Sequence, residues 1–223
     1  MELLDQTIGN IASDIPGATH ILDRYKLDYC NYGGCSLREA AVKRGVDTAE
    51  IVKALERLRE LPSTERSWRD ASPRELINHI LRRFHGRHRE QLPELLHLAR
   101  QVEALESEKT GCPVGLADHI EFMLQDLDTH MSQEEQILFP LLLRGSNTIQ
   151  PADRMRRDHY QHAELLAKLE RLTNDLTPPS DASNTWRLLY AGLTQLREDL
   201  MQHIHLENNV LFQKIGMLVS DQG

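Results

Sequence analysis

The stretch HIHLENNVLF, residues 203–212, decides how the second half of this chain folds. It continues a run of apolar residues spaced three or four apart, which is the spacing of one buried helix face. The run comprises Trp186, Leu189, Leu193, Leu196, Leu200, His203, Glu207 and Val210. His203 and Glu207 therefore stand on a buried face where leucine is expected. A buried, uncompensated carboxylate costs several kcal/mol or more, so this helix predicts a partner for its charge.

Four long helical patterns of this kind follow one another after residue 71. They cover about 72–107, 114–144, 151–177 and 183–215, and each is bounded by proline, glycine or a capping residue. No alternating strand pattern competes with them. Four helices joined by short connections predict an all-α protein built on an up-down-up-down four-helix bundle. Pro93 and Pro140 fall inside these patterns and predict kinks or frayed ends.

The first sixty residues carry shorter helical patterns. Ser36 followed by Glu39 is the signature of a capping box at a helix start, and a further helix is expected from Asp47 or Thr48 to Leu61. We predict a small helical, cysteine-bearing domain at 1–62, a linker at 63–71 and the bundle at 72–218.

Composition narrows the class of protein. The 223 residues carry a net charge of −8, which disfavours nucleic acid and anionic membranes as partners. No run of 18 apolar residues is present, and MELLDQTIGN lacks the pattern of a secretory signal. We therefore expect a cytoplasmic protein. The 3 cysteines, Cys30, Cys35 and Cys112, are expected to be thiols.

The buried face of each other helix is interrupted in the same way. The first pattern contains His85 and His88, and the third contains His159 and His162. The second reads Ile120, Met123, Leu127, His130, Glu134, Ile137, Leu141 and repeats the His-x-x-x-Glu spacing of the fourth. Counted from one end of an antiparallel bundle at 1.5 Å per residue, the eight histidine and glutamate residues fall in a slab roughly 10 Å thick.

The simplest reading of any one such histidine is a hydrogen-bonded core residue, and a single His-x-x-x-Glu is usually a surface pair. Interruption of all four helices at one level favours a metal site. Nitrogen and carboxylate donors without thiolate suit iron or manganese better than zinc or copper. Two metals bridged by Glu134 and Glu207 would use so many ligands best. His79, His97, His119 and His205 lie away from the predicted buried faces and serve as controls.

These motifs resemble a known family. RRFHGRHREQLPEL at 82–95, HMSQEEQILFP at 130–140, RDHYQHAELL at 157–166 and HIHLENNVLF resemble hemerythrin-like domains. With LDRYKLDYCNYGGCSLREA at 22–40, nearly the whole chain resembles the iron–sulfur cluster repair di-iron proteins (the RIC family, of the YtfE and ScdA type, close to NorA).

The resemblance implies a centre of two non-haem iron ions (Fe2+/Fe3+), oxo- and carboxylate-bridged. The metal ligands that it implies are His85, His130, Glu134, His159, His203 and Glu207. His88 and His162 either add a ligand, orient one or line the pocket. The implied function is repair of iron–sulfur clusters damaged by nitrosative or oxidative stress, by iron donation, with nitric oxide bound at the reduced centre.

Three alternatives stay open at this stage. The protein could bind or sense nitric oxide or dioxygen without repair, reduce nitric oxide as an enzyme, or act as a metal-free adaptor. Expected partners are proteins with damaged clusters and a small gaseous ligand; a homodimer is left open. Cys30 and Cys35 are candidate thiols for iron transfer, although the family often has adjacent cysteines and Cys30 can equally be a small core residue. Cys112 is expected to be a loop thiol without a role.

Overall fold

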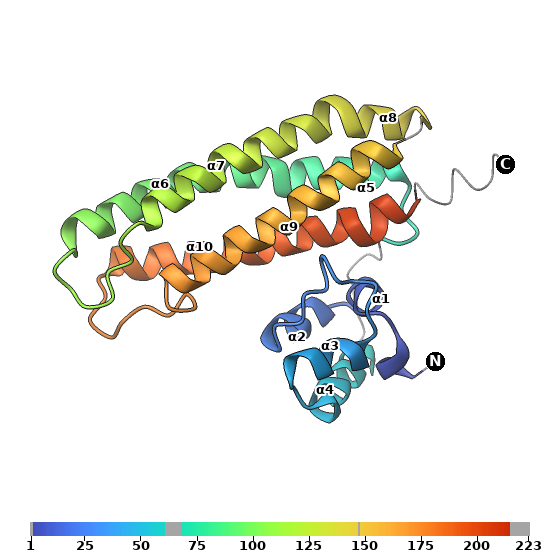
Figure 1. Ribbon diagram of the computed structural model, residues 1–223, viewed down its shortest axis with the longest axis horizontal. Helices are drawn as coiled ribbons and strands as arrows, with labels where there is room; N and C mark the ends of the chain where they lie inside the picture. The colour runs from blue at the N-terminus through green and yellow to red at the C-terminus, as the bar shows by residue number, and fades with distance from the viewer. Residues whose placement is uncertain (1, 61–67, 147, 215–223) are drawn as a thin grey trace. The chain divides into compact units, whose positions relative to one another are not determined.

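The computed structural model describes residues 2–60, 68–146 and 148–214, and this part of the chain is almost entirely helical (Figure 1). The N-terminal elements are short: η1 (Leu3–Asp5), α1 (Ile8–Asp14), α2 (Ala18–Arg24), α3 (Leu37–Arg44) and α4 (Thr48–Glu60). Within the described residues, extended pairing is limited to one isolated bridge between Thr7 and Ser36. The all-α prediction is confirmed; the predicted linker 63–71 lies largely outside the described residues.

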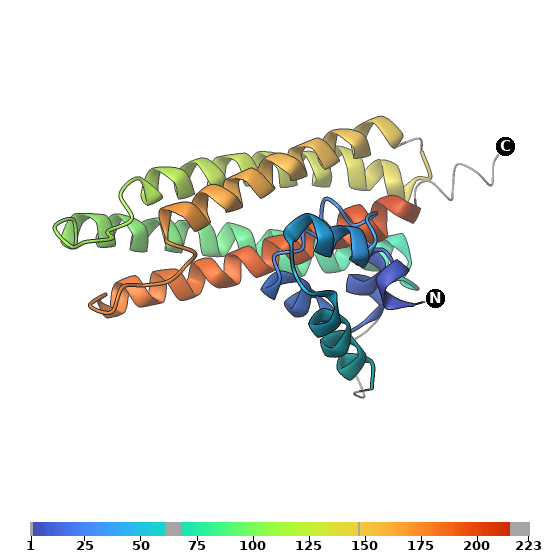
Figure 2. The same cartoon turned by 60° about the horizontal axis from the view of Figure 1, so that its bottom comes forward.

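Four long helical rods follow. The first is α5 (Pro73–Ile80), η2 (Leu81–His85) and α6 (Gly86–Leu105). The second is α7 (Leu116–Gln133), η3 (Glu134–Leu138) and α8 (Phe139–Leu143). The third is α9 (Ile149–Leu172), and the fourth is α10 (Asn184–Leu206) with η4 (Glu207–Leu211). In Figures 1 and 2 the rods lie side by side and alternate in direction along the chain, as predicted for an up-down-up-down bundle.

Contacts divide the chain into two compact units. One comprises His79–Leu200, which holds most of the four rods; the other comprises Met1–Asn78 together with Met201–Gly223. The end of the fourth rod thus groups with the small N-terminal helices. α10 itself runs without interruption from Asn184 to Leu206 and so belongs to both units.

The N-terminal helices follow from local sequence signals. The side chain of Ser36 accepts a hydrogen bond from the Glu39 amide, and the Glu39 carboxylate accepts one from the Ser36 amide, which forms the predicted capping box of α3. The apolar faces of α1 to α4 form a small core of fully buried side chains, among them Ile8, Ile11, Leu22, Leu37, Ile51 and Leu55.

In the unit His79–Leu200, two polar contacts join the first and fourth rods. The Arg83 guanidinium donates two hydrogen bonds to the buried carboxylate of Asp199, at 2.6 and 3.1 Å. Paired bonds of this type fix orientation as well as distance. The amide of Gln91 donates to the Gly192 carbonyl at 2.9 Å. Both contacts fix the register of α10 against the first rod within this unit.

The three elements η2, η3 and η4 are π-helical turns. In each, an amide bonds the carbonyl five residues earlier: Gly86 to Leu81, Phe139 to Glu134, and Phe212 to Glu207. Such turns insert one extra residue into a helix and are often found at functional sites. Behind η3, Pro140 lacks the amide hydrogen that an α-helix would require there.

The extra residue corrects the predicted buried face of the second rod. Up to Glu134 the prediction is confirmed, but Ile137, predicted to be buried, is 52% exposed while Leu138 is 1% exposed. Leu142 is buried in place of Leu141. A regular 3.6-residue period does not anticipate this shift, because the inserted residue rotates everything after Glu134 by about 100°.

Two control histidines also differ from the expectation. His97 is exposed as predicted, but His119 and His205 are buried. His119 bonds the Leu165 carbonyl through Nε2 at 2.9 Å, and burial lowers its pKa. Burial lowers the pKa of His205 to about 4, so this imidazole is neutral at physiological pH. Both histidines satisfy the ordinary rule that a buried polar group is hydrogen-bonded.

None of the helices in the described part of the chain combines the length and the apolar character that crossing a bilayer requires.

The shifted register can be tested by stability. Leu138→Ala should lower the free energy of unfolding by about 2–5 kcal/mol because it leaves a cavity, whereas Ile137→Ala should cost less than about 1 kcal/mol. Urea denaturation of the two variants measures both values. A larger loss for Ile137→Ala would mean that the rod continues as a regular α-helix through this region.

Candidate metal centre

Six of the sequence-predicted residues lie in the interior of the unit His79–Leu200. They are His85, His88, His130, Glu134, His159 and His162, and each is at most 4% exposed. They come from the first three rods, at the level of the π turns η2 and η3. A cluster of imidazoles around a fully buried carboxylate is not a hydrophobic core, and its chemistry follows from which atoms face one another.

Glu134 stands between two imidazoles from different rods. Its Oε2 lies 3.4 Å from Nε2 of His85, and its Oε1 lies 3.4 Å from Nε2 of His130. Each oxygen of the carboxylate therefore faces a different histidine. A carboxylate placed in this way has the geometry to bridge two cations.

His159 faces the second of these imidazoles. Its Nε2 lies 3.1 Å from Nε2 of His130, with the ring centroids 4.9 Å apart. Two donor atoms that are each ~2.1 Å from one ion, at angles of about 90–110°, are separated by roughly 3.0–3.4 Å. The contacts of His130, Glu134 and His159 all have this spacing, so the residues fit neighbouring positions on a metal ion.

The outward nitrogens of two of these histidines face carboxylates. His85 Nδ1 lies 2.8 Å from Oε1 of Glu135, which also accepts a hydrogen bond from Arg89 at 2.7 Å. His130 Nδ1 lies 3.6 Å from Oδ2 of Asp158. A carboxylate behind an imidazole fixes the proton on Nδ1 and turns Nε2 inward as an electron-pair donor.

The pKa values of the outer carboxylates agree with that role. Burial opposes ionisation of Glu135, but the hydrogen bonds from Arg89 and His85 outweigh it and lower the pKa. The contact with His130 is the main cause of the lowered pKa of Asp158. Both groups are therefore charged at neutral pH and favour an imidazole whose Nδ1 carries hydrogen. The sequence reasoning missed both, since they lie outside the buried helix faces from which the ligands were selected.

His162 adds a third ring to the pair His130 and His159. A nitrogen from each of the three lies within 4.8 Å of the others. Its Nε2 is 3.1 Å from Oδ2 of Asp126, whose second oxygen accepts a hydrogen bond from Gln161. Burial lowers the pKa of His162 to about 4, so the ring is neutral. These contacts agree with each of the three expected roles, as a ligand, as a residue that orients one or as a residue that lines the pocket.

The fourth rod carries the same motif in the other compact unit. Nε2 of His203 lies 3.2 Å from Oε1 of Glu207, and both side chains are at most 1% exposed. This contact matches that of His130 with Glu134, and in both cases the glutamate is the first residue of a π turn. The two His-x-x-x-Glu motifs are therefore alike in spacing, contact, burial and backbone form.

The three cysteines are all free thiols. Cys30 is buried, and its Sγ lies 2.9 Å from the Met201 carbonyl to which it donates. Burial raises the pKa of this thiol well above its ordinary value. Cys35 and Cys112 are half-buried. Cys30 is thus a protonated, buried thiol. Of the two candidate thiols for iron transfer, Cys35 is the more accessible.

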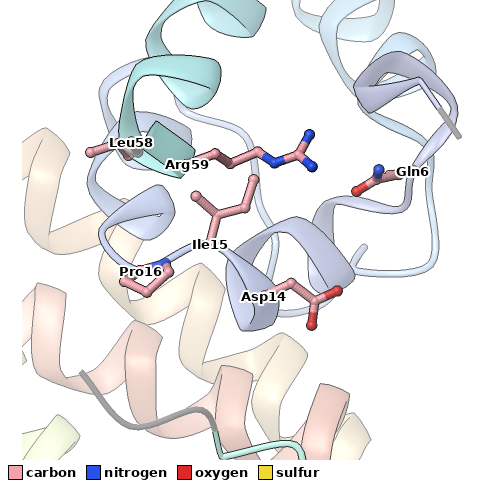
Figure 3. Close-up of a pocket in the computed structure, with 6 residues that line it drawn as sticks. All are labelled: Gln6, Asp14, Ile15, Pro16, Leu58 and Arg59. Atoms are coloured by element: carbon pink, nitrogen blue, oxygen red, sulfur yellow. The ribbon is translucent and has the colours of Figure 1, made fainter. Parts of the chain in front are cut away.

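A small open pocket of about 360 Å³ also occurs among the N-terminal helices (Figure 3). Its lining consists of Gln6, Asp14, Ile15, Pro16, Leu58 and Arg59. Asp14 is engaged by Arg69 at 2.8 Å. None of the predicted site residues lines this pocket, so the buried histidine and glutamate cluster is the candidate site.

Comparison with known families matches both parts of the chain. Residues 76–215 match the family model described as hemerythrin HHE cation binding domain. Residues 4–59 match a domain of unknown function, DUF542, named for the N-terminal part of ScdA. The first match covers more than half of the chain and all six predicted metal ligands.

Curated relatives match almost end to end. The chain is 44% identical over 216 residues to the iron-sulfur cluster repair protein YtfE of Dickeya chrysanthemi, covering 96% of this chain and 98% of that protein. The YtfE protein of Escherichia coli is 41% identical with the same coverage. A probable iron-sulfur cluster repair protein of Haemophilus influenzae is 40% identical over 219 residues, covering 96% and 98%. The chain therefore belongs to the family of iron–sulfur cluster repair proteins that carry a hemerythrin-type cation-binding domain.

Proposed function

We propose that this protein repairs damaged iron–sulfur clusters by donating iron from a pair of non-haem iron ions held in its bundle. The observation that carries the proposal is the buried His85–Glu134–His130–His159 cluster, whose donor atoms have the spacing of metal ligands. The names of the relatives supply the client class, proteins that have lost or damaged iron–sulfur clusters.

The second bridge in this proposal is Glu207, with His203 beside it. Three considerations support it: the two His-x-x-x-Glu motifs match in contact and in backbone form, α10 is continuous, and the hemerythrin model spans 76–215. Two carboxylates shared between two ions would offset part of the positive charge of the ions. The ions would in turn offset the unfavourable free energy of burying two negatively charged side chains.

The donor set favours iron over zinc in this proposal. Four imidazoles and two carboxylates supply at most eight of the twelve positions that two six-coordinate ions offer, and a four-coordinate zinc site needs fewer ligands. When bound in its reduced form, the pair supplies exchangeable Fe(II) and open positions for a small ligand. We propose nitric oxide, or dioxygen, as that ligand.

The residues around the cluster have defined tasks. Glu135 holds the Nδ1 hydrogen of His85, so that Nε2 stays an electron-pair donor, and the Asp158 carboxylate, 3.6 Å from Nδ1 of His130, favours the same form of that ring electrostatically. The apolar bundle excludes water from the site. Cys35, and Cys30 once it leaves the Met201 carbonyl, are the thiols that would take iron towards a client. Thiol chemistry of this kind requires a reducing compartment, which agrees with a cytoplasmic location.

A repair assay tests the function. A [4Fe–4S] dehydratase inactivated by nitric oxide is incubated anaerobically with the iron-loaded protein, and its activity should return. Equal free Fe(II) with a chelator is the control. If nitric oxide binds reversibly while no client recovers, the protein is a binding protein or sensor; if nitrous oxide accumulates with turnover, it is a nitric oxide reductase. Less than about one iron per chain after anaerobic purification would favour the metal-free adaptor.

His203→Leu tests the ligand set. The substitution places an apolar residue on a buried helix face, so the bundle should stay folded while iron per chain and the Mössbauer signal of the pair decrease. His97→Leu is the matched control, because His97 is exposed, contacts Gln101 on the same helix and lies away from the buried cluster. Unchanged iron content in His203→Leu would remove His203 from the site.

Glu135→Gln tests the outer carboxylate behind His85. The neutral amide cannot favour the Nδ1–H form as a carboxylate does, so iron affinity should fall about 10-fold. Competition with a calibrated chelator measures the affinity. Glu121→Gln, which breaks an exposed ion pair with Arg100, should leave it unchanged. Equal affinities in the two variants would show that Glu135 does not position His85.

A further inference from the structure

The cysteine-bearing loop is bonded to the end of the fourth rod, within the compact unit that contains both. Asn209 is the residue at the centre of this contact. Its Nδ2 donates to the carbonyl of Tyr29 at 2.8 Å and lies 3.3 Å from that of Cys30. Asn208 adds a bond to the Cys30 carbonyl at 3.2 Å, and the Cys30 thiol donates to the Met201 carbonyl. Two loop residues, Tyr29 and Cys30, thus contact both the turn that begins with Glu207 and the part of α10 that precedes it.

Asn209 also links this turn to α1 through His205. Its Nδ2 lies 3.0 Å from Nδ1 of His205, and Nε2 of His205 lies 3.3 Å from Oγ of Ser13. Ser13 donates its hydroxyl hydrogen to the Gly9 carbonyl at 2.9 Å. Together these contacts connect η4 to α1 through the His205 ring.

Two glycines make room for the Asn209 carboxamide. A Cβ on Gly33 would collide with this group, and one on Gly9 would lie 2.9 Å from both Asn209 Oδ1 and the Gly33 carbonyl. Neither glycine has a positive φ, so glycine is required at these positions because a Cβ would clash and not because of backbone conformation. The adjacent Gly34 has nothing within 4 Å of the position that a Cβ would take. The loop is therefore shaped around this one side chain.

The turn that Asn209 belongs to needs external support. η4 is a π turn of sequence ENNVL without proline, and isolated π geometry is uncommon because α-helical bonding competes with it. Contacts made outside the helix must therefore favour the π form. Asn208 and Asn209 sit inside the turn, immediately after Glu207, and supply such contacts.

We propose that Asn209 is a positioning residue for Glu207, and that the loop Tyr29–Gly33 thereby determines how firmly iron is retained. The inference rests on the proposed role of Glu207 as an iron ligand. With the carboxamide bonded to the loop, the π turn keeps the Glu207 carboxylate in the orientation that contacts His203. Without those bonds the turn relaxes towards α-helical bonding, and the ligand loses its fixed position.

Three variants test the inference. Asn209→Ala removes the bonds from the helix side, and Gly33→Ala displaces the carboxamide from the loop side while Asn209 stays intact. Gly34→Ala is the matched control. Each protein is loaded anaerobically with Fe(II), and iron loss to a ferrous chelator is followed by absorbance. Hydrogen exchange of residues 207–211 is measured on the metal-free protein, with circular dichroism to check folding.

Asn209→Ala and Gly33→Ala should release iron about tenfold faster than the unmodified protein, and their 207–211 amides should exchange faster. Gly34→Ala should match the unmodified protein in both. If the unmodified protein retains iron and both variants release it at the same rate, the inference is wrong and the proposed function stands. If the unmodified protein retains no iron, the proposed function fails together with the inference. If the 207–211 amides exchange at unchanged rates in both variants, the Asn209 contacts do not stabilise the π turn, whatever the iron measurements show.

Discussion

The structure depends on two carboxylates that are fully withdrawn from water. Glu134 and Glu207 are both 0% exposed, and each contacts a histidine one turn away on its own rod. Neutral imidazoles alone compensate a buried negative charge poorly. Cations held by the histidine and glutamate cluster would compensate it well. Under the proposed function, metal binding and bundle stability are therefore linked, because the groups that would be most expensive in an empty core become ligands.

The π turns explain how regular rods reach such an arrangement. His85 ends one of them, and Glu134 and Glu207 begin the other two. In an unbroken α-helix, the direction of a ligand side chain is fixed by the apolar residues that precede and follow it on the same buried face. One inserted residue rotates the part of the helix after the turn, so the ligand and the apolar residues beyond it can be oriented independently. Three rods use this solution, each at a predicted ligand.

Sequence periodicity was enough to predict the four rods, their order and the polar positions on their buried faces. It selected His203 and Glu207 because a leucine pattern with two exceptions is easy to recognise. It fails after Glu134, where it predicts that Ile137 is buried, because a π turn has no sequence signal as clear as a proline or a cap. Burial of His119 and His205 was also missed, since contacts with other segments decide it. Glu135 and Asn209 contact residues that are distant in sequence, which spacing along one helix does not show.

The buried state of Cys30 has a chemical consequence of its own. Peroxide and nitrosating agents attack the thiolate, and a protonated sulfur atom enclosed by protein reacts slowly with either. While its hydrogen bond to the Met201 carbonyl is intact, Cys30 is therefore shielded from these reagents. A reaction at this sulfur atom requires that the thiol first leaves the Met201 carbonyl.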